Sequence, residues 1–304
     1  VIAFRKTART KIKYTDNQRA KDMGEMLKKI VPHLTRSNLS LPSVLKDPIN
    51  DYEYMQAAAR EIRDKIRPAD GVITYDDLIS FFSDLHATLV PVLWGQSGRH
   101  ENALHIYLPD SETTWVYLNL DTNLIDFKFW MAHELGHIKA PQLRGSEGED
   151  FAEGFAGALL YPSENTGELY NTLSTNRNIG AVVNAIKKEA DKFLISPNTV
   201  YKQLNSYALA KKVPCLGIEE RSFYGACTNF SKEYQIVSKA LFVDEHPAPS
   251  EFIDTVTSVF KTDFYRALGR CVKKEQNGSG FVQRVLDIPA LDAREIYDIL
   301  VKAE

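Results

Sequence analysis

Apolar residues recur at every third or fourth position along most of this 304-residue chain, the spacing that buries one face of an α-helix. The pattern predicts helices at residues 17–30, 51–66, 179–193, 250–272 and 291–301. Another helix is expected to begin at Thr74, because Asp77 stands three residues later and can complete a capping box in place of the usual Glu. The chain is therefore predicted to be mainly helical.

One stretch in the first half departs from this spacing. β-Branched and aromatic residues dominate residues 89–94, 103–108 and 114–120, and a Pro-Asp-Ser-Glu turn signal separates the last two runs. These runs predict a three-stranded sheet directly before the helix at residues 129–138. If the last strand is a free edge beside that helix, it can pair with the backbone of an extended peptide.

The helix at residues 129–138 carries the most specific motif, His-Glu-x-x-His. His133 and His137 lie four residues apart, so both point the same way and can hold one tetrahedral metal ion, usually zinc. Glu134 is placed to take a proton from a metal-bound water. The neighbouring residues are apolar, and buried polar side chains need partners. The alternative is a chance match on a surface helix.

A second helix, at residues 148–162, is predicted from its small and apolar residues and from the Pro at its end. A catalytic zinc site has three protein ligands and keeps one position for water. We therefore expect Glu149 to be the third ligand, with His133 and His137. The alternative for Glu149 is a place on a solvated helix face.

Glu153 lies one helical turn after Glu149 and is expected to face the same way. It could accept the other ring N–H of a ligand histidine, as partners in the second coordination shell of a metal do. Asp150 and Glu153 are also the reserve candidates for the third ligand.

His-Glu-Leu-Gly-His, followed by Glu-x-x-Ala-x-x-Phe-Ala-x-x-Leu-Leu-x-Pro, resembles the ImmA/IrrE family of metallopeptidases. The resemblance covers about residues 50–210 and is most specific between 129 and 162. It implies a zinc-dependent endopeptidase with a gluzincin-like site, whose substrate is a helix-turn-helix repressor or an antitoxin. Many members have Asn or Asp where Glu153 stands, and Met where Tyr161 stands.

The predicted fold class is α+β, a mainly helical zincin-like peptidase domain with a small three-stranded sheet, followed by a helical C-terminal region. We expect a basic N-terminal helical segment at residues 1–48, the peptidase domain at 49–165, a helix-turn-helix-like segment at 166–212 and a C-terminal accessory region at 213–304. The accessory region is expected to select the substrate or bind a partner.

Two segments could contact DNA. Residues 195–204 resemble a helix-turn-helix, from which DNA could be contacted through Asn198, Thr199, Lys202 and Gln203. Residues 1–40 carry ten Lys or Arg against three Asp or Glu, in a chain whose net charge is −3. The alternatives are structural, namely a turn within the peptidase fold and a solvated basic helix.

The remaining His and Cys residues have no motif around them. The cysteines are odd in number and widely spaced, which argues against a disulfide framework and for a reducing cytoplasm. We expect them to be small buried apolar side chains, and we expect the isolated histidines to be structural. These residues are Cys215, Cys227, Cys271, His33, His86 and His246. Apolar runs fall short of the ~20 residues of a membrane helix, so no membrane contact is expected.

The function predicted from these patterns is that of an intracellular zinc endopeptidase with Glu134 as the general base. One rival is a DNA-binding regulator whose zinc site is structural, and another is a toxin component released by an antitoxin. Five side chains near the predicted sheet could stabilise the oxyanion of a tetrahedral intermediate. They are Arg99, His100, His105, Tyr107 and Tyr117.

Overall fold

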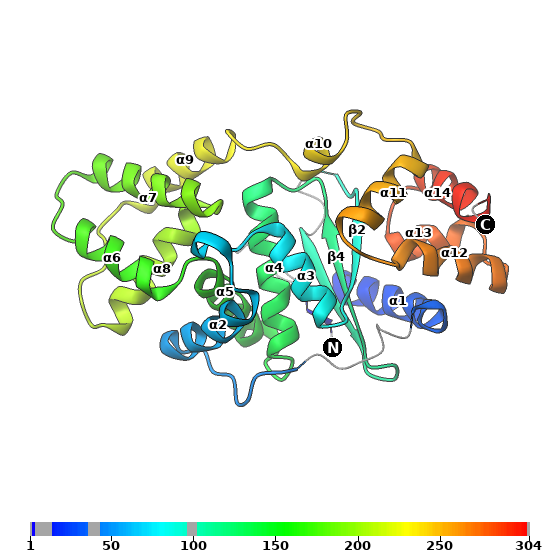
Figure 1. Cartoon of the computed structure of the whole chain (residues 1–304), viewed down its shortest axis with the longest axis horizontal. Helices are drawn as coiled ribbons and strands as arrows, with labels where there is room; N and C mark the ends of the chain where they lie inside the picture. Colours follow the sequence, from blue (N-terminus) through cyan, green and yellow to red (C-terminus); the bar gives the residue numbers. More distant parts are fainter. Residues whose placement is uncertain (1, 4–13, 36–42, 96–101, 303–304) are drawn as a thin grey trace. The chain divides into compact units, whose positions relative to one another are not determined.

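The architecture comes from a computed structural model, which describes residues 2–3, 14–35, 43–95 and 102–302. Helices account for most of these residues, and the strands form one small mixed sheet (Figure 1). The predicted α+β class with a helical C-terminal region is confirmed. None of the helices among the described residues has both the length and the apolar composition needed to cross a membrane.

The chain divides into two compact units, each built from separate stretches of sequence. The first contains Val1–Ser43, Ile79–Thr122 and Ile236–Glu304, and the second contains Val44–Leu78 and Asn123–Gln235. This division differs from the four consecutive segments that we predicted. The strands of the predicted domain at residues 49–165 belong to the first unit, together with the C-terminal helices, whereas its motif helices belong to the second.

The sheet of the first unit has the strand order β1-β3-β4-β2. β4 is antiparallel to β3 and parallel to β2, and Trp115 in β4 lies opposite Ile106 and Thr88. The three predicted strands are confirmed. β4 has a neighbour on both sides, so the condition of a free edge at residues 114–120 is not met. The strands are β1 (Ile2–Ala3), β2 (Thr88–Val92), β3 (Ala103–Leu108) and β4 (Thr113–Asn119).

The outer edge of β2 is covered by the C-terminal segment. The Thr262 hydroxyl donates to the Leu89 carbonyl at 2.6 Å, and the Tyr265 hydroxyl donates to the Pro91 carbonyl at 2.7 Å. Pro91 has no N–H to leave unpaired, which is why Pro is tolerated on edge strands. These contacts satisfy the edge groups that could otherwise pair with another chain.

The single helix predicted at residues 250–272 is in fact two, α11 (Pro249–Val259) and α12 (Phe264–Glu275). Lys261 between them has a φ of 49°, in the left-handed region that ends helices. The Thr262 hydroxyl then accepts from the Phe264 N–H at 3.3 Å. The apolar pattern runs through this break because Phe260 and Phe264 are both buried.

Of the other helices of the first unit, some precede strands β2 to β4 in the sequence and the rest follow them. At the N-terminal end, α1 buries Met23, Leu27 and Ile30, as its apolar spacing predicted. The remaining elements are α1 (Tyr14–Ile30), the 3-10 helix η1 (Val31–His33), α10 (Val237–Leu241), α13 (Ser279–Leu286) and α14 (Ala290–Lys302).

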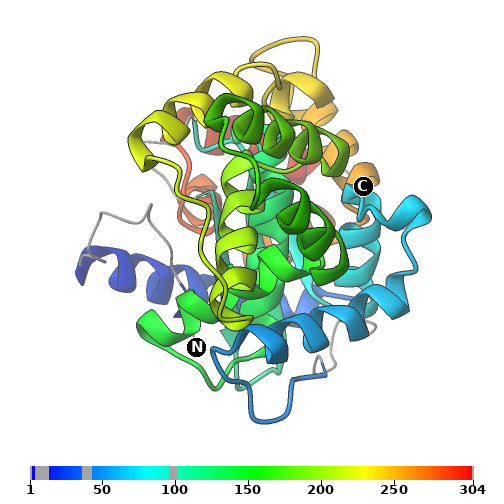
Figure 2. The same ribbon diagram turned by 90° about the vertical axis from the view of Figure 1, so that its left-hand side faces the viewer.

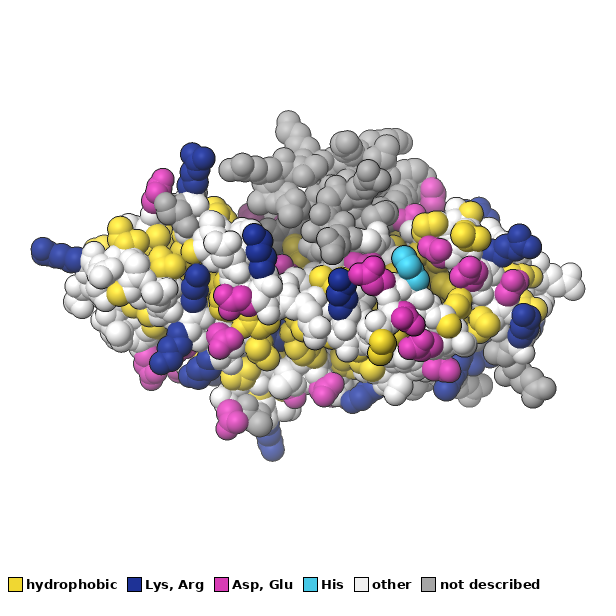
Figure 3. All heavy atoms as spheres, turned by 90° about the horizontal axis from the view of Figure 1, so that it is seen from above, with side chains coloured by type: hydrophobic (Ala, Val, Ile, Leu, Met, Phe, Trp, Pro, Cys, Tyr) yellow, Lys and Arg dark blue, Asp and Glu magenta, His cyan; other side chains and the backbone are white. Residues whose placement is uncertain are grey.

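A surface pocket of about 1020 Å³ in the first unit combines aromatic walls with acidic side chains. Trp94, Phe242 and Phe252 supply aromatic surface, and Figure 3 shows acidic side chains gathered over the C-terminal helices. The acidic members of its lining are Asp121, Asp244, Glu245, Asp287, Asp292 and Glu295. Such a lining suits the expectation that this region contacts a partner, which stays a prediction.

The second unit consists of helices, and α5 packs against α4, α2 and α8 (Figures 1 and 2). Helix α7 has the predicted bounds, and Pro162 follows the end of α5 as expected. The helices are α2 (Tyr52–Ile66), α4 (Leu124–Lys139), α5 (Gly145–Leu160), α6 (Ser163–Leu173), α7 (Ile179–Phe193), α8 (Pro197–Ala210) and α9 (Glu220–Ser231).

The division between the units falls inside α3 (Tyr75–Asp84), after Leu78. The predicted capping box begins this helix. The Thr74 N–H donates to the Asp77 carboxylate at 2.8 Å, and the Asp77 N–H donates to the Thr74 hydroxyl at 3.1 Å. Asp can therefore replace Glu in the reciprocal arrangement.

The predicted helix-turn-helix is formed by α7 and α8, and two of the four side chains considered for DNA contact are buried. Thr199 and Gln203 are buried, and Gln203 accepts a hydrogen bond from Gln56 at 3.1 Å. Lys202 forms an ion pair with Glu153. Because a buried side chain cannot reach a base edge, Thr199 and Gln203 are not placed to contact DNA, and their positions agree with the structural alternative for this segment. Residues 4–13 of the basic N-terminal segment lie outside the described residues.

We predict that Thr262→Val destabilises the protein by about 1–3 kcal/mol, because it leaves the Leu89 carbonyl and the Phe264 N–H without their hydroxyl partner. Denaturant unfolding measures the change. Thr257→Val is the matched control, since its hydroxyl is buried and has no hydrogen-bond partner among the described residues. The control should be neutral or stabilising, and an equal loss in both variants would contradict the assigned role of Thr262.

Candidate metal centre

Helix α4 starts at a well-defined cap. The Asn123 side chain accepts from the Ile125 N–H at 3.1 Å and donates to the carbonyls of Ser231 and Tyr234, both at 2.8 Å. The cap therefore joins the start of α4 to the end of α9, which fixes the position of the helix within the second unit. Farther along α4, every residue from Met131 to Ala140 is buried.

The polar trio of α4 lies within this buried stretch, as predicted. His133 is 0% exposed, Glu134 is 2% exposed and His137 is 8% exposed. The motif therefore does not lie on a surface helix. Three polar side chains in such surroundings cost free energy unless their groups are paired.

Helix α5 lies unusually close to α4 at Gly136. A Cβ atom at this position would lie 2.8 Å from the Ala152 Cα and 3.3 Å from the Phe155 ring, which is too close for any side chain. Gly136 therefore permits the approach of the two helices. This approach brings Glu149, near the start of α5, to the two histidines of α4.

The three predicted ligands are brought together. The Nε2 atoms of His133 and His137 are 3.1 Å apart, and the Glu149 carboxylate oxygens lie 3.5 Å from His133 Nε2 and 3.4 Å from His137 Nε2. Ligands bound to one tetrahedral ion at about 2.0–2.1 Å are about 3.3–3.4 Å from each other. The group could therefore hold one metal ion.

The electrostatics of Glu149 suit a ligand. Burial raises the pKa of this carboxyl, but hydrogen bonds and the charges of His133 and His137 outweigh burial and lower it to about 2. The side chain is 21% exposed, so the third ligand reaches the surface while the histidines do not. The carboxylate is thus ionised at neutral pH, as metal binding requires.

The reserve candidates for the third ligand are not favoured. Asp150 is exposed and is not part of the metal-binding group. Glu153 accepts from Lys202 of α8, and this ion pair holds α5 against α8. The expected hydrogen bond from a ligand histidine to Glu153 stays a prediction.

Aromatic rings form one wall beside the centre. The Trp130 ring lies 5.3 Å from the His133 ring in an edge-on arrangement, and the Phe129 ring lies 6.2 Å from it. Both aromatic residues are partly exposed. They can shield one side of the imidazole from water and leave apolar surface for a ligand.

Lys128 is a buried charged residue of α4 that the sequence pattern did not reveal. Its ammonium group donates to the carbonyls of Ile73 and Phe193, and burial lowers its pKa to about 7. Phe193 is the last residue of α7, where carbonyl groups lack partners within the helix. Lys128 thus joins α4 to two segments, and an apolar period alone cannot predict such a contact.

The oxyanion candidates are not gathered at this centre by any described contact. Tyr117 is fully buried and its hydroxyl donates to the Val285 carbonyl at 2.9 Å, while His105 is buried in β3. Tyr107 also lies in β3. Arg99 and His100 lie outside the described residues.

No known family model matches the chain, and a comparison with curated proteins finds no match.

We predict that Gly136→Ala destabilises the protein by about 1–3 kcal/mol and weakens metal binding, because the added methyl group must push α5 away from α4. Thermal unfolding and metal titration measure the two effects. Gly180→Ala in α7 is the control, since its site is exposed and should gain stability from helix propensity. Full metal affinity in Gly136→Ala would show that helix spacing does not set the ligand distances.

Proposed function

We propose that this chain is a zinc-dependent endopeptidase, with His133, His137 and Glu149 as ligands and Glu134 as the general base. The observation that supports it best is the ligand geometry, in which two nitrogens and one carboxylate lie at separations suited to a single tetrahedral ion. The donor set is the one seen in zinc peptidases with two His and one Glu.

Zinc identity is supported by the ligand types. Imidazole suits zinc, whereas magnesium and calcium prefer oxygen ligands. When bound, zinc would supply a Lewis acid that acidifies a water molecule and polarises the scissile carbonyl. Three protein ligands leave the fourth position for that water, which is the arrangement of a catalytic rather than a structural site.

Glu134 is the proposed general base of the reaction. It follows the first ligand in sequence on the same helix and is buried, but it is not one of the three grouped ligands. A carboxylate in this place can accept the proton of the attacking water and then donate it to the leaving amine. A purely structural zinc site needs no such group.

We predict that Glu149→Ala removes one equivalent of zinc per chain, because the two histidines alone leave the ion with too few protein ligands. Elemental analysis after dialysis measures the loss. Asp150→Ala is the matched control, since Asp150 is exposed and outside the group. If Glu149→Ala kept this equivalent and Asp150→Ala lost it, the ligand role would move to Asp150.

Glu134→Gln separates catalysis from metal binding. Gln is nearly isosteric with Glu but cannot accept the proton, so zinc should bind as before while peptide hydrolysis falls by at least ~10²-fold. The assay incubates the chain, with and without zinc, with a small helix-turn-helix repressor or antitoxin as the candidate substrate, and mass spectrometry identifies the products. Undiminished cleavage by Glu134→Gln would refute the role of Glu134 and with it the proposed mechanism.

The substrate class rests on the resemblance to the ImmA/IrrE family, which suggests a helix-turn-helix repressor or an antitoxin. A toxin released by an antitoxin would use the same peptidase on another target. The rival of a DNA-binding regulator with a structural zinc site is weakened, because two of the four side chains expected to contact DNA are buried. Loss of repressor release or of toxicity in cells that express Glu134→Gln would favour a peptidase over that rival, because a DNA-binding regulator needs no general base.

A further inference from the structure

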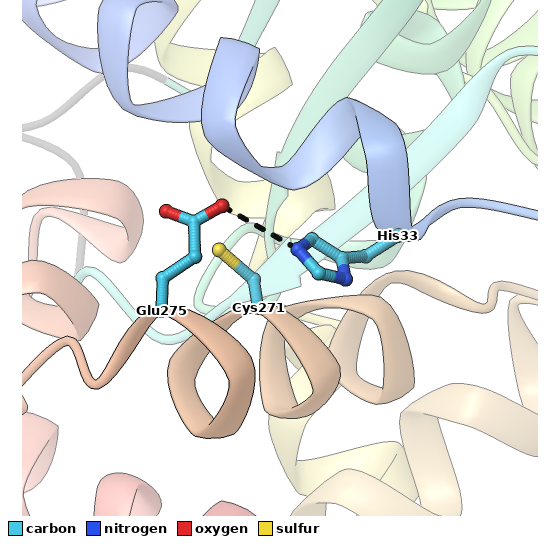
Figure 4. A group of neighbouring side chains, drawn as sticks. All are labelled: His33, Cys271 and Glu275. Carbon is cyan, nitrogen blue, oxygen red and sulfur yellow. Dashed lines mark ion pairs between the residues drawn. The ribbon is translucent and has the colours of Figure 1, made fainter.

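Three side chains of metal-ligand type converge in the first unit, away from any motif. Figure 4 shows His33 at the end of η1 facing Cys271 and Glu275, which stand four residues apart on α12. One ligand atom from each lies within 4.8 Å of the others. The sequence pattern assigned His33 and Cys271 to structural roles because no spacing linked them to each other.

Two side chains of α12 donate hydrogen bonds to backbone carbonyl groups of the segment that carries His33. The Arg270 guanidinium donates to the His33 carbonyl at 3.0 and 2.7 Å and also forms an ion pair with Asp263. The Cys271 thiol donates to the Lys29 carbonyl at 3.4 Å. Both ends of the turn from α1 through η1 are therefore bound to α12, so the backbone that carries His33 lies beside Cys271 in advance of any ion.

The distance between the His33 and Glu275 side chains is the distance expected between two ligands of one metal ion. His33 Nε2 and Glu275 Oε1 are 3.5 Å apart, which is beyond the usual range of a hydrogen bond. It matches the 3.4 and 3.5 Å between histidine and carboxylate at the centre on α4 and α5. It also agrees with the ~3.3–3.4 Å expected for neighbours on one tetrahedral ion.

The chemistry of the group favours a zinc-like ion. Imidazole and thiolate are preferred by zinc, whereas calcium and magnesium take oxygen ligands. Cys271 is 0% exposed and the His33 side chain is 7% exposed, but that of Glu275 is 37% exposed. A bound ion would therefore be held from the interior and reached from solvent past Glu275.

We propose that His33, Cys271 and Glu275 form a second metal site, of the zinc type, that fastens η1 to α12. Binding forms a metal–sulfur bond, breaks the S–H bond and releases its proton to solvent, so no oxidant or reductant is needed. The ion would join the N-terminal helical segment to the C-terminal helices of the same unit, with water in the fourth position that three protein ligands leave. This inference does not depend on the peptidase activity.

Cobalt(II) provides a direct test, because only a site with a thiolate ligand gives a sulfur-to-cobalt charge-transfer band. The centre at His133, His137 and Glu149 has no thiolate, so it cannot produce this signal. Titration of the metal-free, reduced full chain should give the band in the wild type and not in Cys271→Ser. Cys227→Ser is the matched control, since Cys227 is also buried but is outside the metal-binding groups of the described residues.

Glu275→Gln keeps the test independent of folding, because this side chain lies partly at the surface. It should weaken cobalt binding at the thiolate site by at least ~10-fold, because loss of even an outer partner costs about 10–100-fold. Zinc analysis should give two equivalents in the wild type and one in Glu149→Ala. Absence of the band in the wild type, its persistence in Cys271→Ser, or unchanged affinity in Glu275→Gln would each overturn the second site.

Discussion

The close approach of α4 and α5 at Gly136 is the constraint on which the metal centre depends. Two ligands come from α4 and the third from α5, so the distance between the helices sets the distance between the ligands. Helices with ordinary side chains at their contact lie about 8–10 Å apart. A glycine facing Ala152 permits the close approach, and the separations of 3.4 and 3.5 Å between Glu149 and the two histidines depend on it.

The cost of burying polar groups explains how the surrounding helices are joined. α4 buries four polar side chains, each of which needs a compensating partner. They are Lys128, His133, Glu134 and His137. Lys128 finds carbonyls of two other segments, and the histidines find Glu149 of α5. These contacts fix the position of α4 relative to α5, α7 and the segment at Ile73, because a hydrogen bond or ion pair requires specific atoms to meet. The polar groups therefore position the helices as well as serving the proposed chemistry.

In the first unit, side-chain hydroxyl groups donate hydrogen bonds to carbonyl groups of an edge strand. Thr262 and Tyr265 complete the outer edge of β2, and this takes up the edge that could have paired with a substrate. The C-terminal helices are thus part of the sheet's structure and not a separate appendage. The proposed second metal site would extend the same arrangement by fastening η1 to α12. Tests at the two metal sites are independent, because their ligands belong to different units.

Local patterns in the sequence determined the helical periods, the capping box at Thr74 and the spacing of His133, Glu134 and His137, because each depends on residues within one turn or one strand. The sequence also indicated Glu149, since one acidic helix followed the histidine helix closely. Only the tertiary structure decided that β4 is an interior strand, that Lys261 interrupts the predicted long helix, and that Thr199 and Gln203 are buried. It alone brought His33 to Cys271. Such features depend on which distant segments pack together, and the period of a single helix carries no information about its neighbours.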